Sequence, residues 1–184
     1  MQIKFWFISA LLFLLYLPAA VFGGLEEAVF PKDKVIENDL LKAGDKIILE
    51  SLIKGDVITA GSAIRSQGHI SGDLLAAGSY IHHTGRLEGN ARLVGRDIFI
   101  DGVVEKNLSA AGYNVALNQE ALVKGNLLIT GSDISISGRI QGGLIVRGDS
   151  VTLAGEVLKD VEIYANSLKI SPRANFNGTV TYFG

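Results

Sequence analysis

The chain of 184 residues contains no cysteine, which excludes disulfide bonds, cysteine-based zinc sites and the acylated cysteine of a lipoprotein. Only 3 prolines are present, so a proline-rich disordered linker is also excluded. No run of Lys and Arg exceeds two residues and the formal net charge is −2, which indicates neither a nucleic-acid groove nor a polybasic membrane patch. What remains is a chain of 48% hydrophobic residues, enough for the core of one domain.

The longest apolar run stands at the N-terminus. It reads "FWFISALLFLLYLPAAVFGG", follows Lys4 and contains no charge. Such a run is typical of a signal peptide, and it is also nearly long enough, at roughly 20 residues, to span a bilayer. We therefore expect residues 1–23 to be a signal peptide or an N-terminal membrane anchor, and residues 24–37 to be a linker or a cap. Either alternative places residues 38–184 on the non-cytoplasmic side of a membrane.

From residue 38 onward the chain is a repeat. Divided at each G-D-like corner, it forms eight pieces of 17, 17, 17, 17, 19, 17, 17 and 19 residues, followed by a stub. A glycine stands six residues into seven of these pieces: Gly44, Gly61, Gly78, Gly95, Gly112, Gly131 and Gly148. A second glycine recurs thirteen residues in, as Gly68, Gly85, Gly102, Gly138 and Gly155. A period held over this length indicates a repeat architecture.

Apolar residues occupy fixed positions within each unit. The third residue, the tenth residue and the residue two before the next unit are apolar throughout, and polar residues alternate with them. Alternation with period two is the pattern of a strand. Three short strands per unit, with glycines that supply unusual backbone angles at the corners, describe a three-sided parallel β-helix. The prediction is an all-β, single-stranded solenoid of about eight coils of 17–19 residues, preceded by an N-terminal hydrophobic helix.

Two of the three histidines, His82 and His83, are adjacent, which raises the question of a metal or catalytic site. In the repeat, His82 falls at an outward position next to Arg65, and a cation there disfavours a bound metal ion. His83 falls in an inward column next to Ser66, where a buried hydrogen bond would satisfy both side chains. His69 belongs to another side of the coil. We therefore expect structural histidines, with no catalytic residue, no metal ligand and no cofactor.

A column of acidic and amide side chains follows one corner. It begins with Asp39, Asp56 and Asp73 and continues with asparagines in the next units. Stacked carboxylates can bind calcium, which favours several oxygen ligands. Asp and Asn also suit tight turns, because their side chains hydrogen-bond their own backbone. The calcium-binding nonapeptide rich in Gly and Asp is absent, so the column favours turn chemistry and leaves calcium binding open.

Enzymes with coils of this kind leave signatures that the sequence lacks. Hexapeptide-repeat acyltransferases show an aliphatic residue every six positions, whereas the corner glycines here stand about 7 and 10 residues apart. Pectate-lyase-like helices have longer coils, with loops that carry catalytic clusters. No Ser/His/Asp set, phosphate-binding loop or close carboxylate pair stands out. The sequence therefore predicts a protein that is not an enzyme.

The coils "GDVITAGSAIRSQGHISGDLLAAGSY" and "GNLLITGSDISISGRIQGGLIV" resemble those of bactofilins, bacterial polymer-forming cytoskeletal proteins. The resemblance covers residues 38–184 and rests on the style of the repeat. It implies a right-handed β-helix that assembles end to end without nucleotide, often at the inner membrane, and organises the cell wall or cell shape. Typical members have a short tail and stay cytoplasmic. The apolar N-terminus here indicates a relative exported across the bacterial inner membrane or anchored in it.

The last stub, "GTVTYFG", stops within a coil and has no polar cap, so an end of the stack exposes strand edges and apolar core. We expect assembly to use end residues on both sides: Leu40, Ile47, Leu49, Ile53, Leu168, Ile170, Phe176, Val180, Tyr182 and Phe183. Two different ends that meet head to tail extend a rod and do not close it, whereas two like ends that meet would give a dimer. A stub that folds over its own end, or a cap from residues 25–37, would instead leave a monomer.

Two classes of function follow. The first is a structural scaffold at the cell envelope that forms a head-to-tail homopolymer. It would contact the membrane through an uncleaved N-terminal segment, with cell-wall components as further partners and no nucleic acid. The second is a monomeric secreted β-solenoid that serves as a binding or adhesion module. A binding face should show a ladder of like side chains, and the mixed outward columns favour the scaffold.

Overall fold

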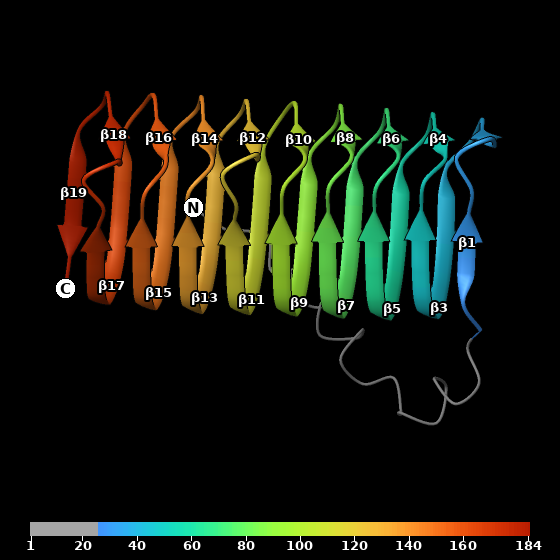
Figure 1. The fold of residues 1–184 in the computed structure, drawn as a ribbon, viewed down its shortest axis with the longest axis horizontal. Coiled ribbons are helices and arrows are strands. Elements are labelled where there is room, and N and C mark those ends of the chain that lie inside the picture. Colours follow the sequence, from blue (N-terminus) through green and yellow to red (C-terminus); the bar gives the residue numbers. More distant parts are fainter. Residues whose placement is uncertain (1–25) are drawn as a thin grey trace, which may run out of the picture.

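The computed structural model describes residues 26–184, which wind into one parallel β-solenoid of about nine turns (Figure 1). Strands and turns account for the regular structure of these residues, and none of their segments is a helix that could cross a membrane. The predicted N-terminal helix falls within residues 1–25 and lies outside the described residues. The solenoid fold itself is confirmed, with about one turn more than the eight coils expected.

Each full turn consists of one long and one short strand. The ten-residue long strands are β3 (Leu40–Leu49), β5 (Val57–Ser66), β7 (Leu74–His83), β9 (Ala91–Ile100), β11 (Leu108–Leu117), β13 (Leu127–Ile136), β15 (Leu144–Leu153) and β17 (Val161–Ile170). The short strands are β2 (Val35–Ile36), β4 (Leu52–Ile53), β6 (His69–Ile70), β8 (Arg86–Leu87), β10 (Val103–Val104), β12 (Leu122–Val123), β14 (Arg139–Ile140), β16 (Glu156–Val157) and β18 (Asn175–Phe176). Two further strands, β1 (Ala28–Phe30) and β19 (Val180–Phe183), lie at the ends of the stack.

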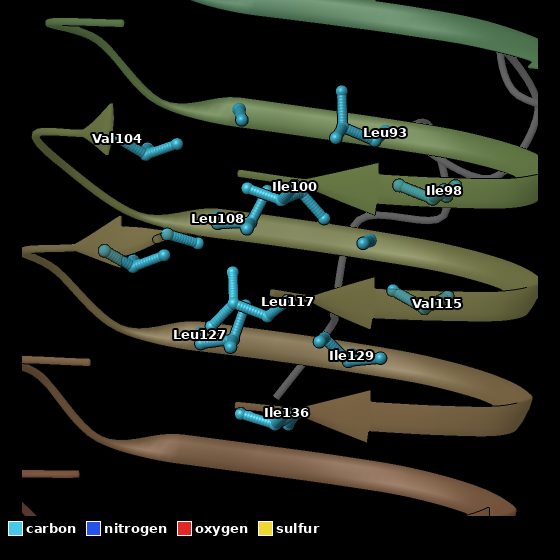
Figure 2. Packing of buried hydrophobic residues seen from close by; sticks show 14 of the residues in the cluster. Leu93, Ile98, Ile100, Val104, Leu108, Val115, Leu117, Leu127, Ile129 and Ile136 are labelled. Atoms are coloured by element: carbon cyan, nitrogen blue, oxygen red, sulfur yellow. The ribbon is translucent and has the colours of Figure 1, made fainter. Parts of the chain in front are cut away.

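Every long strand bends at its centre, and its two halves run along different sides of the solenoid (Figures 1 and 2). A glycine stands at the bend of all of them except β17, which has Ala165 there. In β7 the first half is Leu74–Ala77 and the second half is Tyr80–His83, with Gly78 at the bend. Parallel pairing with β9 continues through both halves. The three straight segments of each turn are therefore two halves of one strand and one short strand, where three separate strands were expected.

The interior is filled by inward side chains that repeat from turn to turn. Figure 2 shows Leu93, Ile98, Ile100 and Val104 of one turn pointing inward, with equivalent residues stacked above or below them. All four are at most 1% exposed. Each such aliphatic side chain stabilises the fold by roughly 1.5–3 kcal/mol when fully buried. The predicted apolar columns thus form one continuous core.

One core column was missed by the sequence analysis. It is the fifth residue of each unit after the first, where Lys42 is exposed, and contains Thr59, Ala76, Leu93, Ala110, Ile129, Val146 and Ile163, all buried. Its members range from alanine and threonine to isoleucine, so no constant aliphatic type marks it. From β5 to β17 it makes the first half of each long strand as deeply buried on its inner side as the second half.

Glycine stands at seven of the eight bends because successive turns approach closely there. A Cβ placed on Gly78 would lie 2.4 Å from the carbonyl oxygen of Gly61, and one on Gly95 would lie 2.4 Å from that of Gly78. No glycine of the described residues has a φ in the left-handed range. The expectation of unusual backbone angles at the corners was therefore wrong, and the close passage of backbone over backbone is the physical reason for the glycine columns.

Candidate assembly ends of the solenoid

The N-terminal end of the solenoid is stepped. Strand β1 pairs with the second half of β3, through Ala28↔Ile47 to Phe30↔Leu49, and β2 pairs with β4. The first half of β3, residues 40–43, pairs with β5 on one side only. Its outward Leu41 is 79% exposed. Two sides of the solenoid therefore extend one strand further than the third.

Polar contacts hold β1 and β2 on this end. Lys46 Nζ lies 2.7 Å from Glu27 Oε1, and the Ser51 hydroxyl donates a hydrogen bond of 2.8 Å to the Pro31 carbonyl. Residues 28–36, within the segment expected to be a linker or a cap, thus form an incomplete turn of the solenoid itself.

The C-terminal end is stepped in the opposite sense. Strand β19 pairs with the first half of β17, through Val161↔Val180 to Tyr164↔Phe183. The second half of β17, residues 167–170, pairs with β15 on one side only, and Ile170 is 48% exposed. The C-terminal end therefore carries an extra strand on the side formed by the first halves of the long strands. The N-terminal end lacks a strand on this same side.

Aromatic contacts fix β19 in place. The Tyr182 hydroxyl donates a hydrogen bond of 2.8 Å to the Ala165 carbonyl. The Phe183 ring stacks on Tyr164 with centroids 4.7 Å apart and planes 9° apart. On the turn before, Arg147 places its guanidinium 4.8 Å from the centroid of the Tyr164 ring. The final strand is thus a formed part of the solenoid and does not fold over the end.

The three sides contain equal numbers of strands. The short strands form a nine-stranded sheet, and the ten strands of the other sheet include β1 at one end and β19 at the other. Because β1 pairs only with a second half and β19 only with a first half, each half of the long strands also contributes nine strands. The C-terminal end lacks a second half and a short strand in its last turn, and the N-terminal end carries these strands as β1 and β2.

The structure divides the ten predicted end residues into two groups. Leu40, Leu168, Ile170, Phe176, Val180, Tyr182 and Phe183 lie at open ends and are partly or largely exposed. Ile47, Leu49 and Ile53 are at most 1% exposed, because β1 and β2 cover them, so their placement at an end was wrong. The apolar residues at the N-terminal end are instead Ala28, Phe30, Ile36 and Leu40, all partly buried.

A sequence signal for this extra turn exists. Ala28 and Phe30 precede Ile47 and Leu49 by 19 residues, which is one of the two unit lengths of the repeat. The signal was missed because the unit that contains them has no glycine at the bend position.

The adjacent histidines point to opposite sides of the wall. His83 is 1% exposed, and its Nδ1 lies 3.1 Å from the Ser66 hydroxyl, which confirms the predicted buried hydrogen bond. His83 Nε2 makes a long contact of 3.5 Å with the Val103 carbonyl. This arrangement suits a neutral ring that donates from Nε2 and accepts the Ser66 hydroxyl proton at Nδ1. Ser66 and His83 lie within the core and do not face a substrate cavity.

The outward His82 has a partner that the sequence analysis missed. Its Nε2 lies 2.7 Å from Asp101 Oδ2, and its ring packs edge-on against Tyr80 and Phe99 with centroids 6.3 Å away. His69 lies on β6, where its Nε2 is 2.9 Å from Glu88 Oε1. Each histidine thus has its own protein contact.

The stability of the fold should depend on pH through His83. Burial of the ring lowers the pKa of His83 to about 4 from 6.5. His83 therefore binds a proton more readily in the unfolded chain than in the folded chain. Its contribution to the free energy of unfolding is fully present above pH 6.5 and is lost as the pH falls toward about 4. By linkage the loss is about 3 kcal/mol.

This expectation is tested with His83→Leu, which suits the apolar column. Urea unfolding at pH 7 and at pH 4.5 should show a smaller loss of free energy in this variant than in the wild type. His69→Leu is the matched control and should lose as much as the wild type. An equal loss in all three proteins would contradict the assignment to His83.

The acidic column at the corner is a ladder of side chain–backbone hydrogen bonds. Asp39 Oδ1 accepts from the Asp56 N–H at 2.9 Å, and Asp56 Oδ1 accepts from the Asp73 N–H at 2.7 Å. Asp73 Oδ1 continues with the Asn90 N–H at 2.7 Å, and this bond holds the pKa of Asp73 below its usual value. No group of three His, Asp or Glu side chains in residues 26–184 is arranged to hold a metal ion. The bonds join residues 17 positions apart, so each side chain bonds the next turn of the solenoid and not, as the turn interpretation expected, its own backbone.

The ladder is interrupted once, at Gly143. A shallow groove of about 440 Å³ opens beside this position, between Leu128, Ile145 and Glu162. A Cβ on Gly143 would lie 3.2 Å from the Asp160 carbonyl oxygen, so a side chain fits after a small shift. An Asn here would sit where the other ladder residues sit and would accept the Asp160 N–H.

Gly143→Asn should therefore stabilise the fold by about 1 kcal/mol, through one new hydrogen bond and a less flexible unfolded chain. In thermal unfolding this corresponds to a rise in Tm of about 3 °C. Gly142→Asn is the matched control and should destabilise, because a Cβ there would lie 2.3 Å from the Gly125 carbonyl oxygen. A lower Tm for Gly143→Asn would show that the ladder adds no stability at this turn.

Comparison with known proteins identifies the fold family. A family model described as "Bactofilin: Polymer-forming cytoskeletal" matches residues 79–181, more than half of the chain. Searches of the curated proteins and of the solved structures gave no significant match. The matched segment lies within the repeat, from the second half of β7 into β19. On the match of this model, the chain belongs to the bactofilin family.

Proposed function

We propose that this protein is a structural scaffold that assembles end to end, head to tail, at the bacterial cell envelope. The polymer-forming character of the family supports self-assembly. The observation that carries the head-to-tail arrangement is the complementarity of the two stepped ends. The turn that β19 begins lacks a second half and a short strand, and β1 and β2 of the next copy supply both.

The register of the repeat sets the contacts in this shared turn. Ala28 of one copy would follow Leu168 of the other, Phe30 would follow Ile170, and Ile36 would follow Phe176. On the third side, Leu40 would follow Val180. Every pair joins two apolar residues of the same inward column, so the core would continue through the joint.

The energetics favour a filament over a closed ring. The joint pairs three open strand edges and buries apolar side chains that are partly exposed in the single copy. Two different surfaces meet along the axis of a rod, and such a contact adds copies without closing. With nine strands on each side, one copy adds roughly 43 Å to the filament.

The envelope location rests on the N-terminal apolar run, which would direct the solenoid to the non-cytoplasmic side. In that compartment, the membrane and cell-wall components are the proposed partners, and cell-shape or wall organisation is the proposed role. A membrane-impermeant maleimide added to spheroplasts that express the full chain as Ser135→Cys should label this exposed position, because the chain has no other cysteine. Labelling only after the membrane is lysed would contradict this location.

Engineered disulfides test the arrangement of the ends directly, because the chain has no cysteine of its own. In the head-to-tail joint Val29 and Lys169 are neighbours on adjacent strands, about 5 Å apart, within the range that a disulfide bridges. Mild oxidation of Val29→Cys/Lys169→Cys should therefore give a ladder of covalent multimers.

Each single variant is the matched control and should remain uncrosslinked. The pair Val29→Cys/Leu41→Cys probes the other arrangement, in which like ends meet through antiparallel strands. Multimers with this pair and none with the first would contradict the head-to-tail arrangement while keeping end-to-end assembly. Uniform short particles in electron microscopy, without multimers from either pair, would contradict assembly itself.

A further inference from the structure

The corner between β18 and β19 holds the one Asn–Gly pair of the chain, Asn177–Gly178. Every other asparagine is followed by a residue that has a side chain. Asn177 is exposed, and it lies just before the strand that forms the C-terminal step. Asparagine is a chemically labile residue, and a glycine after it leaves the next backbone nitrogen open to the side-chain amide.

The fold requires the glycine of this pair. A Cβ on Gly178 would lie 2.4 Å from the Lys159 carbonyl carbon and 2.6 Å from the Asp160 nitrogen, so no larger residue fits against the turn before. The residue that precedes the glycine has no such restriction. At equivalent corners it is Lys54, Glu88, Lys124 or Gln141. The last turn thus combines a glycine that the packing demands with an exposed asparagine that it does not demand.

The reaction open to this pair is deamidation, with water as the co-reactant. The Gly178 nitrogen gives its proton to water or hydroxide and bonds to the side-chain carbonyl carbon of Asn177, whose amide nitrogen leaves as ammonia. Water then opens the five-membered imide, adding a hydroxyl to one carbonyl carbon and a proton to the ring nitrogen. Opening at the side-chain carbonyl gives aspartate, and opening at the main-chain carbonyl gives isoaspartate. No group is oxidised or reduced.

The backbone nitrogen that attacks is not held by another contact. Within residues 26–184 the Gly178 N–H donates no hydrogen bond, whereas the Gly142 N–H, two turns earlier, donates to the Gly125 carbonyl at 3.1 Å. The residue before Gly142 is Gln141, which would have to close a six-membered ring in place of a five-membered one. Gln141–Gly142 is therefore an unreactive counterpart within the same chain.

Isoaspartate would lengthen a corner that is fixed on both sides. Before the corner, the Asn177 N–H donates to the Val157 carbonyl at 3.0 Å. After it, the Thr179 N–H donates to Asp160 Oδ1 at 2.9 Å, and the Thr179 carbonyl accepts from the Val161 N–H at 2.8 Å. In isoaspartate the main chain runs through the side-chain carbonyl, so one more methylene lies between these contacts. The register of β19 against β17 is therefore lost.

Strand β19 has little else to hold it. Its four residues are all exposed, and it pairs with β17 on one side only. A strand at the edge of a stack with so few contacts separates at a low cost in free energy. Its loss would remove the step that the proposed head-to-tail joint uses.

We propose that Asn177 is a deamidation site, and that isoaspartate there releases β19 and ends the ability of a free copy to assemble. The reaction is one-way, so it limits the time in which a free copy can join a filament. In the joint, β2 of the next copy would pair with β18 and Glu37 would follow Asn177, which holds the corner in place. Assembled copies should therefore react more slowly. The effect on assembly rests on the proposed end-to-end contact, whereas the modification does not.

The modification is tested by peptide mass spectrometry of the purified full chain after incubation at 37 °C and pH 8.5. The tryptic peptide that follows Arg173 should gain the mass difference between a hydroxyl and an amino group, located at Asn177. Chromatography should separate it into an aspartate and an isoaspartate form. The peptide with Gln141 and Gly142 is the internal control and should stay unchanged. An unchanged Asn177 would overturn the inference.

The effect on assembly is tested by pelleting the aged protein. Isoaspartate should be several-fold enriched in the supernatant over the filament pellet, and aged Asn177→Gln should pellet as completely as fresh protein. Because Asp101–Gly102 is the same in this variant, the comparison isolates Asn177. Equal isoaspartate in pellet and supernatant would overturn the effect on assembly.

Two further variants separate the causes. Asn177→Asp carries the charge of one product without the longer main chain, so it should still pellet, and its failure to do so would overturn the release of β19 as the cause. Asn177 in Ile170→Asp, a single copy, should react several-fold faster than in wild-type filaments. Fresh wild type that forms no pellet would overturn the end-to-end assembly itself, and the mass spectrum would still decide the modification.

Discussion

Ile170→Asp should abolish end-to-end assembly and leave a folded single copy. Ile170 is the last residue of β17, and at 48% exposure a carboxylate there can still reach water. In the shared turn the same position lies against Phe30 of the next copy, inside the continued core. Burying an unpaired charge costs several kcal/mol, and every 1.4 kcal/mol weakens association about tenfold. Assembly should therefore weaken by more than about 100-fold.

Sedimentation velocity of the full chain measures this loss. The wild type should sediment as a distribution of long species, and Ile170→Asp as one slow species with an unchanged far-UV spectrum. Ser135→Asp adds the same charge to an outward position in the middle of the solenoid and should sediment like the wild type. Long species in Ile170→Asp would show that the second half of β17 is not at the joint.

Ile98→Asp should unfold the middle of the solenoid. Ile98 is 0% exposed and lies between Ile81 and Val115 in its column, with no polar partner nearby. A carboxylate in that position is an unpaired buried charge, and the expected loss exceeds about 4 kcal/mol. Because each turn is stabilised only by its neighbours, the damage separates the turns before β9 from those after it.

Ile98→Val is the matched control, since it removes one methylene and should cost about 1 kcal/mol. Thermal unfolding followed by circular dichroism should show a single transition for this control, close to that of the wild type. For Ile98→Asp, limited proteolysis should cut near β9 at temperatures where the wild type is resistant. Resistance equal to that of the wild type would mean that the column tolerates a charge by local rearrangement.

The sequence predicted the parts of the fold that depend on which residues are apolar. The period, the three apolar columns and the Ser66–His83 hydrogen bond are all confirmed, because a one-residue error in register would have placed polar side chains throughout the core. The continuity of each long strand through its bend was not predictable in this way. It depends on backbone pairing across Gly78 and its equivalents, which leaves no mark on side-chain type.

The assembly ends were predictable in part. The C-terminal residues Ile170, Tyr182 and Phe183 were placed correctly at an end, because the repeat stops visibly within a coil. At the N-terminal end the predicted solenoid began at residue 38 and left out the incomplete turn formed by β1 and β2. Phe30 lies in a unit without the glycine that marks the others, and only its pairing with Leu49 identifies it as part of the stack.

All three sides contain the same number of strands. The number of turns therefore sets the length of one copy, whereas the two stepped ends set how copies join. Removing residues 72–88, one whole turn of 17 residues, would shorten each copy by about 5 Å and leave both stepped ends as they are. Removing half a turn would leave ends that no longer match. The spacing of anything attached to the chain along a filament is thus adjustable in steps of one turn, independently of how the copies join.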